Sequence, residues 1–116
     1  MTSEVATAEQ PLPSPSGRYK LSVVMTEVNG EPVQYFQIKD AGDVVVFACQ
    51  ERFTARDTTY MLWDEAERVW VYSGDVGTYF WEQSEDMAIW VKHAYASSNV
   101  PAPQFLKERR PRWITR

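Results

Sequence analysis

This sequence predicts an α+β fold: a five- or six-stranded, mostly antiparallel β-meander packed by one C-terminal amphipathic helix, with a disordered N-terminal arm. Three observations predict it. Residues 1–17 are rich in proline, residues 18–82 alternate β-type runs with turn signals, and the pattern changes to a helical period at Ser84. With 116 residues, the chain fits one domain of ordinary size. We therefore expect an arm at 1–17, a single α+β domain at 18–100 and a basic, aromatic C-terminal extension at 101–116.

The N-terminal arm is expected to lack fixed structure. It contains three of the seven prolines, Pro11, Pro13 and Pro15, and only Val5 and Leu12 as larger aliphatic side chains. Such a segment buries too little apolar area to offset the entropy lost on ordering. We expect a flexible or polyproline-like linker, with docking of its Pro-x-Pro spacing into a partner's aromatic groove as the alternative.

The first strands are expected to form a hairpin. Apolar residues alternate from Tyr19 to Met25, which is the period of a half-buried strand. Asn29 and Gly30 are the pair best suited to the two positive φ angles of a type I′ turn, and β-type residues resume at 33–39.

Four further strands are expected along the middle of the chain. The continuous apolar run at 44–48 is typical of a strand covered on both faces, so we place it centrally in the sheet. An irregular connection at 50–57 follows. Strands are then expected at 58–63, 69–72 and 78–81, separated by turns.

The expected helix spans residues 84–97. Ser84 is a good N-cap, Glu85 and Asp86 suit the positive end of the helix dipole, and apolar residues from Met87 to Ala94 recur at helical spacing. A second, short helix is expected at 104–109, between Pro103 and Pro111.

Charge is distributed unevenly along the chain. Residues 1–106 carry seven Lys/Arg and fifteen Asp/Glu side chains, whereas residues 107–116 carry five and one. An acidic body disfavours nucleic acid as a partner, because binding of nucleic acid depends on neutralising phosphate charge. The basic end suits contact with an acidic surface, or serves only to keep the chain in solution.

The expected compartment is the cytoplasm. No stretch reaches the roughly 18 apolar residues of a membrane span, and the first residues lack the apolar centre of a signal peptide, so no membrane contact is expected. Cys49 lies in an apolar run, which fits a buried, inert thiol in a reducing compartment.

The residue types give little support to metal or cofactor chemistry. One Cys and one His cannot build a zinc site of the common Cys/His kinds. The loop at 73–77 has two glycines around an acid but lacks the spacing and lysine of a phosphate loop, so a plain turn explains it. We expect no metal, no cofactor and no catalytic residue, and whether the chain is an enzyme stays open, with the balance towards a non-enzyme.

Aromatic side chains, at 14% of the chain, allow two interpretations. If the helix covers only one face of the sheet, the other face shows aromatics to solvent and forms a binding surface. If the sheet folds over or closes, both faces are buried. The sequence leaves both interpretations open.

Our leading hypothesis is a non-catalytic protein-interaction module, such as a small inhibitor, adaptor or assembly subunit of bacterial or phage type. It would bind a protein partner or a second copy of itself, because Arg and aromatic residues are typical anchors of protein interfaces. The residues expected to bind the partner are Trp70, Tyr72, Tyr79, Trp81, Phe105, Leu106, Arg109, Arg110, Arg112 and Trp113.

Two alternatives belong to other classes. A small-ligand-binding protein or small enzyme would hold its ligand between sheet and helix with Asp75, Glu82 and His93. An acidic phosphate mimic would instead block a nucleic-acid-binding protein, with its charge at residues 64–67.

Overall fold

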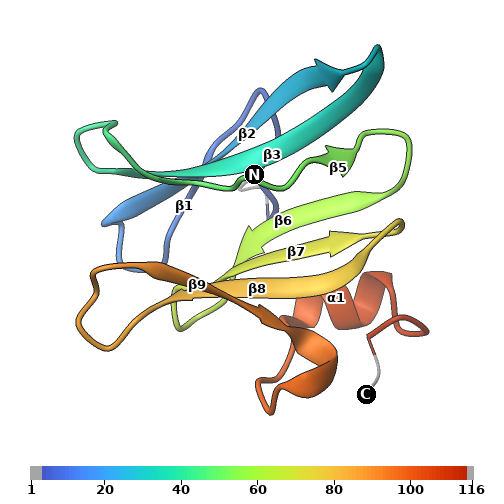
Figure 1. Ribbon diagram of the computed structural model, residues 1–116. Helices are drawn as coiled ribbons and strands as arrows, with labels where there is room; N and C mark the ends of the chain where they lie inside the picture. The colour runs from blue at the N-terminus through green and yellow to red at the C-terminus, as the bar shows by residue number, and fades with distance from the viewer. Residues whose placement is uncertain (1–3, 115–116) are drawn as a thin grey trace.

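The chain folds into two antiparallel β-sheets that pack face to face, as the computed structural model of residues 4–114 shows (Figure 1). The first sheet contains β1 (Leu12–Pro13), β2 (Tyr19–Val28), β3 (Glu31–Asp40), β4 (Val45–Ala48) and β5 (Phe53–Thr54). The second contains β6 (Thr59–Trp63), β7 (Val69–Ser73), β8 (Gly77–Gln83) and β9 (Trp90–Ala94). A 3-10 turn, η1 (Tyr95–Ser97), and a helix, α1 (Gln104–Arg109), follow.

Strand order follows the chain in both sheets. The first sheet is ordered β1-β2-β3-β4, with β5 also paired to β3, and the second is ordered β6-β7-β8-β9. Every pairing is antiparallel. The predicted antiparallel meander is therefore confirmed, although its strands divide between two sheets.

The β2–β3 hairpin forms as its local sequence predicts. Val28 pairs with Glu31, which leaves a two-residue loop of Asn29 and Gly30. Their φ angles are 51° and 79°, the left-handed values that a type I′ turn requires at both positions. Glycine and asparagine adopt these angles at the lowest cost, which explains why the turn lies here.

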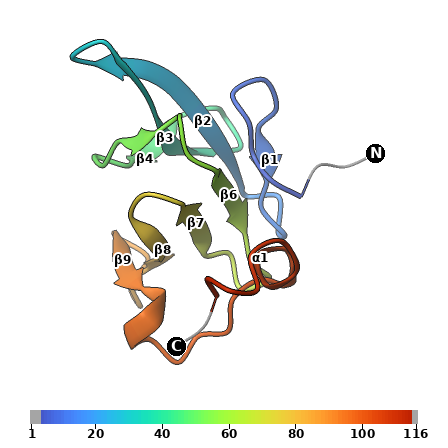
Figure 2. The same cartoon turned by 90° about the vertical axis from the view of Figure 1, so that its right-hand side faces the viewer.

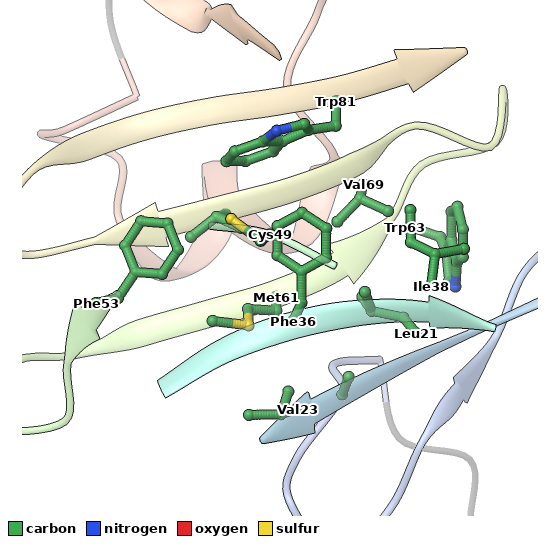
Figure 3. Packing of buried hydrophobic residues seen from close by; sticks show 12 residues of the cluster. Leu21, Val23, Phe36, Ile38, Cys49, Phe53, Met61, Trp63, Val69 and Trp81 are labelled. Carbon is green, nitrogen blue, oxygen red and sulfur yellow. The ribbon is translucent and has the colours of Figure 1, made fainter. Parts of the chain in front are cut away.

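The main core lies between the two sheets (Figure 3). Leu21 of β2 and Phe36 of β3 are fully buried and point towards Val69 and Trp81 of the second sheet. The rings of Phe36 and Trp81 meet edge to face, with centroids 4.9 Å apart. These large side chains interlock across the two sheets and supply much of the apolar burial that stabilises a small domain.

A third layer covers the outer face of the second sheet. Trp70 of β7 and Phe80 of β8 stack there with ring centroids 4.7 Å apart. They belong to one buried cluster with Ala102, Leu106 and Ile114 of the C-terminal segment. Figure 2 shows the first sheet on one side of the second sheet and α1 on the other. The second sheet is therefore buried on both faces.

The prediction of an amphipathic helix at 84–97 is wrong. A loop and then β9 occupy this segment, and β9 completes the second sheet. In the loop, the Ser84 N–H donates to the Ile89 carbonyl (2.9 Å), the Met87 N–H donates to the Ser84 carbonyl (2.8 Å), and Ser84 Oγ donates to the Asp86 carboxylate (2.6 Å). Serine and aspartate close turns by the same local hydrogen bonds with which they cap helices, so the capping signal was ambiguous.

The short helix α1 has the bounds that the sequence predicts. Pro103 occupies its N-cap position, and the Arg110 N–H closes its last turn on the Leu106 carbonyl at 2.8 Å. Proline is well tolerated at the start of a helix because it lacks the N–H that would be unpaired there. Within residues 4–114, no helix has both the length and the apolar character needed to cross a membrane.

The prediction that the 44–48 strand lies centrally in the sheet is also wrong. Residues 45–48 of this run form β4, which ends the first sheet. Val44, Val45 and Val46 are 60%, 44% and 44% exposed, and Phe47 alone of the large side chains packs against the core. A continuous apolar run does favour a covered strand, but the neighbours of a strand are set by pairing with distant residues, which the run does not encode.

The disordered N-terminal arm is not confirmed. The Ala6 N–H donates to the Met61 carbonyl on β6 at 2.8 Å, and β1 pairs with β2. In addition, the indole Nε1 of Trp63 on β6 donates a hydrogen bond to the Leu12 carbonyl of β1 at 2.9 Å. Backbone and indole hydrogen bonds thus fix residues 4–17 against both sheets despite their low apolar content.

Candidate functional site

The aromatic strand residues expected to bind a partner lie mostly inside the molecule. Trp70, Tyr72 and Trp81 are all buried. Tyr79 is half-buried, and the Lys92 ammonium lies 4.2 Å from its ring centroid. The first sheet and the C-terminal segment cover the two faces of the second sheet, so of the two interpretations left open, burial of both faces is the one observed.

The expected C-terminal contact residues divide between core and surface. Leu106 is fully buried, and Phe105 is half-buried. The Arg109 guanidinium lies 5.0 Å from the Phe105 ring centroid, within the range of a cation–π contact. Trp113 is 65% exposed, which is unusual for tryptophan in a small domain. The solvent-exposed members are Arg109, Arg112 and Trp113, and Arg110 is half-buried.

Two of the three residues proposed as a ligand set lie together. His93 Nε2 is 3.1 Å from Glu82 Oε1, and the His93 ring stacks on Phe80 with centroids 5.0 Å apart. Asp75 lies in the β7–β8 turn, at the opposite end of the sheet from Glu82. The structure therefore does not assemble the three into one site.

Arg68, which the sequence reasoning did not select, joins Glu82 to a second acid. Arg68 Nε lies 2.9 Å from Glu82 Oε2, and its Nη1 lies 3.0 Å from Asp64 Oδ2. Trp70 Nε1 also donates to Asp64 Oδ2 at 2.9 Å. Burial lowers the pKa of Arg68, but the bonds to both carboxylates outweigh it and raise that pKa overall. Each charge in this network has a partner, which suits a structural role.

The acidic residues at 64–67 are mostly engaged as well. Asp64 binds Arg68, and Glu67 accepts hydrogen bonds from the N-terminal segment and pairs with Arg18 at 3.1 Å. Burial raises the pKa of Glu67, but hydrogen bonds from two serines and Arg18 outweigh it and lower the pKa to about 2. Of these acids, only Glu65 is in the exposed class, so the turn presents little free charge for phosphate mimicry.

The described part of the chain contains neither a reactive thiol nor a group of side chains arranged to bind a metal ion. Burial raises the pKa of the Cys49 thiol to about 11, so little reactive thiolate forms near neutral pH. No group of three or more His, Cys, Asp or Glu side chains within residues 4–114 is arranged to hold a metal ion.

Two clefts open on the second sheet. The larger, of about 710 Å³, lies between the N-terminal segment, the β6–β7 turn and the residues around the start of α1, and two of its charged lining residues, Asp64 and Arg68, are bonded to each other. The smaller, of about 430 Å³, lies at the other end of the sheet. Its lining residues are Asp57, Thr58, Tyr72, Ser73, Gly74, Gly77, Thr78, Tyr95, Ala96, Arg110 and Trp113.

An apolar surface lies along the open side of the sheet pair. The Lys92 ammonium on β9 bonds Glu51, which follows β4, at 2.7 Å, so the two edges lie close together. Figure 1 shows the β3–β4 and β8–β9 loops at the same end, and Figure 2 shows β4 and β9 on the same side. The exposed residues at the β4 edge, which we name the β4 edge surface, are Val44, Val45 and Val46.

Two features thus stand apart from internal packing: the β4 edge surface and the smaller cleft at Arg110. The first is apolar and borders an unpaired strand edge. The second contains an arginine without an acidic partner among residues 4–114. Neither protein-family models, nor curated proteins, nor solved structures match this chain significantly.

Proposed function

We propose that this chain is a non-catalytic protein-interaction module that binds an apolar β-strand of a partner protein along β4. One observation supports the proposal most strongly: β4 ends the first sheet, and three consecutive valines, Val44 just before the strand and Val45 and Val46 within it, are exposed. Exposed, contiguous apolar surface is costly in water, and in folded proteins it commonly marks an interface.

The backbone of β4 supports strand addition. The outer side of an edge strand has N–H and C=O groups that no neighbouring strand uses, and proteins usually protect such an edge with charge, proline or a covering segment. β4 reads VVFA and contains neither charge nor proline. A partner strand added here would gain main-chain hydrogen bonds, while the valine side chains would supply apolar contact.

The length of β4 limits what can be added. It has four residues, and its register with β3 shifts so that Val46 has no Cα partner on that strand. A short, bulged edge accepts one strand less readily than a long flat one, but it also resists the stacking of many strands that leads to fibrils. This geometry suits a single, reversible partner contact.

Charge at the two ends of β4 indicates the chemistry of the partner. Asp43 is paired with Lys20, and Glu51 is paired with Lys92. Because both acids are neutralised within the chain, the edge between them attracts neither a basic nor an acidic segment. The favoured partner is an uncharged strand whose alternate side chains are apolar.

The non-catalytic part of the proposal rests on the state of the polar groups. Glu82 and His93 bind each other, and Arg68 binds both Glu82 and Asp64. General acid–base catalysis needs a group that is free to exchange a proton with a substrate. Charges that are engaged with one another favour a structural role for this network.

A matched pair of valine variants tests the proposal. Peptides are selected from a random display library on the immobilised protein, and a selected peptide is then titrated against wild type, Val46→Lys and Val28→Lys. Val28 is the control because it is 46% exposed, against 44% for Val46, but lies at the far end of the β2–β3 hairpin. We expect Val46→Lys to weaken binding by about tenfold or more and Val28→Lys to change it by less than about twofold.

Amide exchange identifies the contact directly. On binding of the selected peptide, the amides of residues 44–48 gain protection from hydrogen exchange if a strand has been added. Equal binding to wild type and Val46→Lys, or protection elsewhere only, would refute the proposal. So would a dimer of the free protein that Val46→Lys converts to monomer, because the strand would then come from a second copy.

A further inference from the structure

The smaller cleft gathers residues from four separate parts of the chain. Thr58 precedes β6, Tyr72 lies on β7, Tyr95 begins η1, and Arg110 and Trp113 follow α1. These segments converge at the right-hand end of the second sheet in Figure 1. The volume of about 430 Å³ is within the range of small-molecule sites.

Arg110 is the unusual residue in this cleft. Its guanidinium lies 5.7 Å from the Tyr72 ring centroid. Its Nε is buried and, within residues 4–114, has no hydrogen-bond partner. No hydrogen bond or ion pair joins its terminal nitrogens to a described residue, and the side chain lines the cleft. The Tyr72 ring therefore positions this cation, and no acidic side chain among residues 4–114 forms an ion pair with it.

Another half-buried arginine, Arg68, shows the contrast. Arg68 binds two carboxylates, at 2.9 and 3.0 Å, which compensate its charge for the loss of water. A half-buried charge without such a partner is costly, and a ligand that supplies the missing anion relieves that cost. A carboxylate fits best, because its two oxygens match the paired N–H groups of a guanidinium.

The remaining lining indicates the rest of the ligand. Trp113, 65% exposed, offers a flat apolar surface at the rim. Asp57 lines the same cleft, so Arg110 is the one cation among the cleft residues and an acid lies near it. One arginine can compensate one negative charge on a ligand, whereas the second charge of a phosphate would be repelled by Asp57 without a second cation to offset it.

We propose that this cleft binds a small organic monocarboxylate, with the carboxylate on Arg110 and an aromatic or apolar body against Trp113. The site shares no residue with the β4 edge surface, so it goes beyond the proposed interaction function and is independent of it.

Phenylacetate and its neutral amide, phenylacetamide, test the proposal on the wild-type protein. The two differ in charge but little in shape. Amide NMR follows the Arg110 Nε–H and the Trp113 indole N–H during titration with each. We expect phenylacetate to shift both signals to saturation with a Kd of about 1 mM or tighter, and phenylacetamide to bind about tenfold more weakly or not at all. Equal binding of the two, or no saturable shift with phenylacetate, would overturn the proposal.

Two arginine variants and a second anion complete the test. Arg110→Met keeps the length of the side chain without its charge, and Arg109→Met removes an exposed neighbouring charge as the control. We expect phenylacetate binding to fall about tenfold in the first and to change less than about twofold in the second. Equal loss in both would mean that general positive charge attracts the anion, and tighter binding of phenyl phosphate than of phenylacetate would refute the monocarboxylate preference.

Discussion

Glu67 fastens the N-terminal segment to the turn between β6 and β7. Its Oε2 accepts hydrogen bonds from the Ser16 N–H at 3.0 Å and the Ser16 hydroxyl at 2.5 Å, while its Oε1 pairs with Arg18 at 3.1 Å. Its side chain is only 14% exposed, so solvent screens these bonds less than those of a typical surface pair. One carboxylate thus orders a proline-rich segment whose composition predicts disorder.

Glu67 is therefore expected to make the stability of the protein depend on acid pH. Its pKa is about 2 in the folded chain, against an ordinary 4.5. The stabilisation from ionised Glu67 is fully present above pH 4.5 and is lost as the pH falls towards 2. Glu67→Gln should lower the free energy of unfolding by about 2 kcal/mol at pH 7 and flatten the acid dependence. Urea unfolding between pH 2 and pH 7 measures both effects.

Glu65→Gln is the matched control for this prediction. It makes the same chemical change two residues earlier in the turn, on an exposed side chain. Its effect should stay within about 0.5 kcal/mol. Equal destabilisation by the two variants, or an unchanged acid dependence in Glu67→Gln, would show that the contacts of Glu67 contribute little.

At the scale of elements, the segment before β9 offers a test that separates a loop from a helix. Met87 has a φ of 60°, a left-handed angle that is costly for a long side chain such as methionine and that glycine adopts freely, and the side chain is half exposed. Met87→Gly should raise the free energy of unfolding by about 0.5–1 kcal/mol. In a helix, the same change would lower it by about 1 kcal/mol. Thermal unfolding gives the sign, with Ala88→Gly as a neighbour that lacks the positive φ.

What the sequence could predict was local. The β2–β3 hairpin follows from adjacent alternation and the Asn29–Gly30 pair, and α1 follows from its flanking prolines. The segment at 84–97 was ambiguous because its apolar residues fit both a helical stripe and an alternating strand. Pairing with β8 decides between the two in favour of the strand β9, because only a strand can form hydrogen bonds along the edge of β8.

The candidate sites could be predicted only in part, because they depend on contacts between distant residues. Arg110 and Trp113 were selected as contact residues from composition, but the cleft also needs Tyr72 and Tyr95, which lie far away in sequence. The apolar run of β4 was visible, whereas its place at the edge depends on which strand pairs with β3. No local pattern carries that information.

At the scale of the whole molecule, three layers depend on one another. The first sheet covers one face of the second sheet, and residues 101–114 cover the other through Ala102, Leu106 and Ile114. The C-terminal segment therefore contributes to the core as well as to the surface. Both proposed binding features depend on this arrangement, because β4 needs a stable first sheet and the Arg110 cleft needs the C-terminal segment in place.

Removal of residues 101–116 should therefore unfold the domain and not merely remove a binding tail. Truncation after Val100 would expose the stacked pair of Trp70 and Phe80, which are now 0% and 1% exposed. The lost apolar burial amounts to roughly 5 kcal/mol or more, which is comparable to the whole stability of a small domain. We expect the truncated chain to lose its near-ultraviolet circular dichroism and to bind hydrophobic dyes.

A milder change separates lost packing from a general effect of truncation. Leu106→Ala in the full chain removes one fully buried side chain and should cost about 2–5 kcal/mol while leaving a cooperative urea transition. Arg112→Ala, on an exposed side chain of the same segment, should change the midpoint very little. If the truncated chain kept the unfolding midpoint of the full chain, residues 101–116 would be an appendage, and the two sheets alone would form the stable unit.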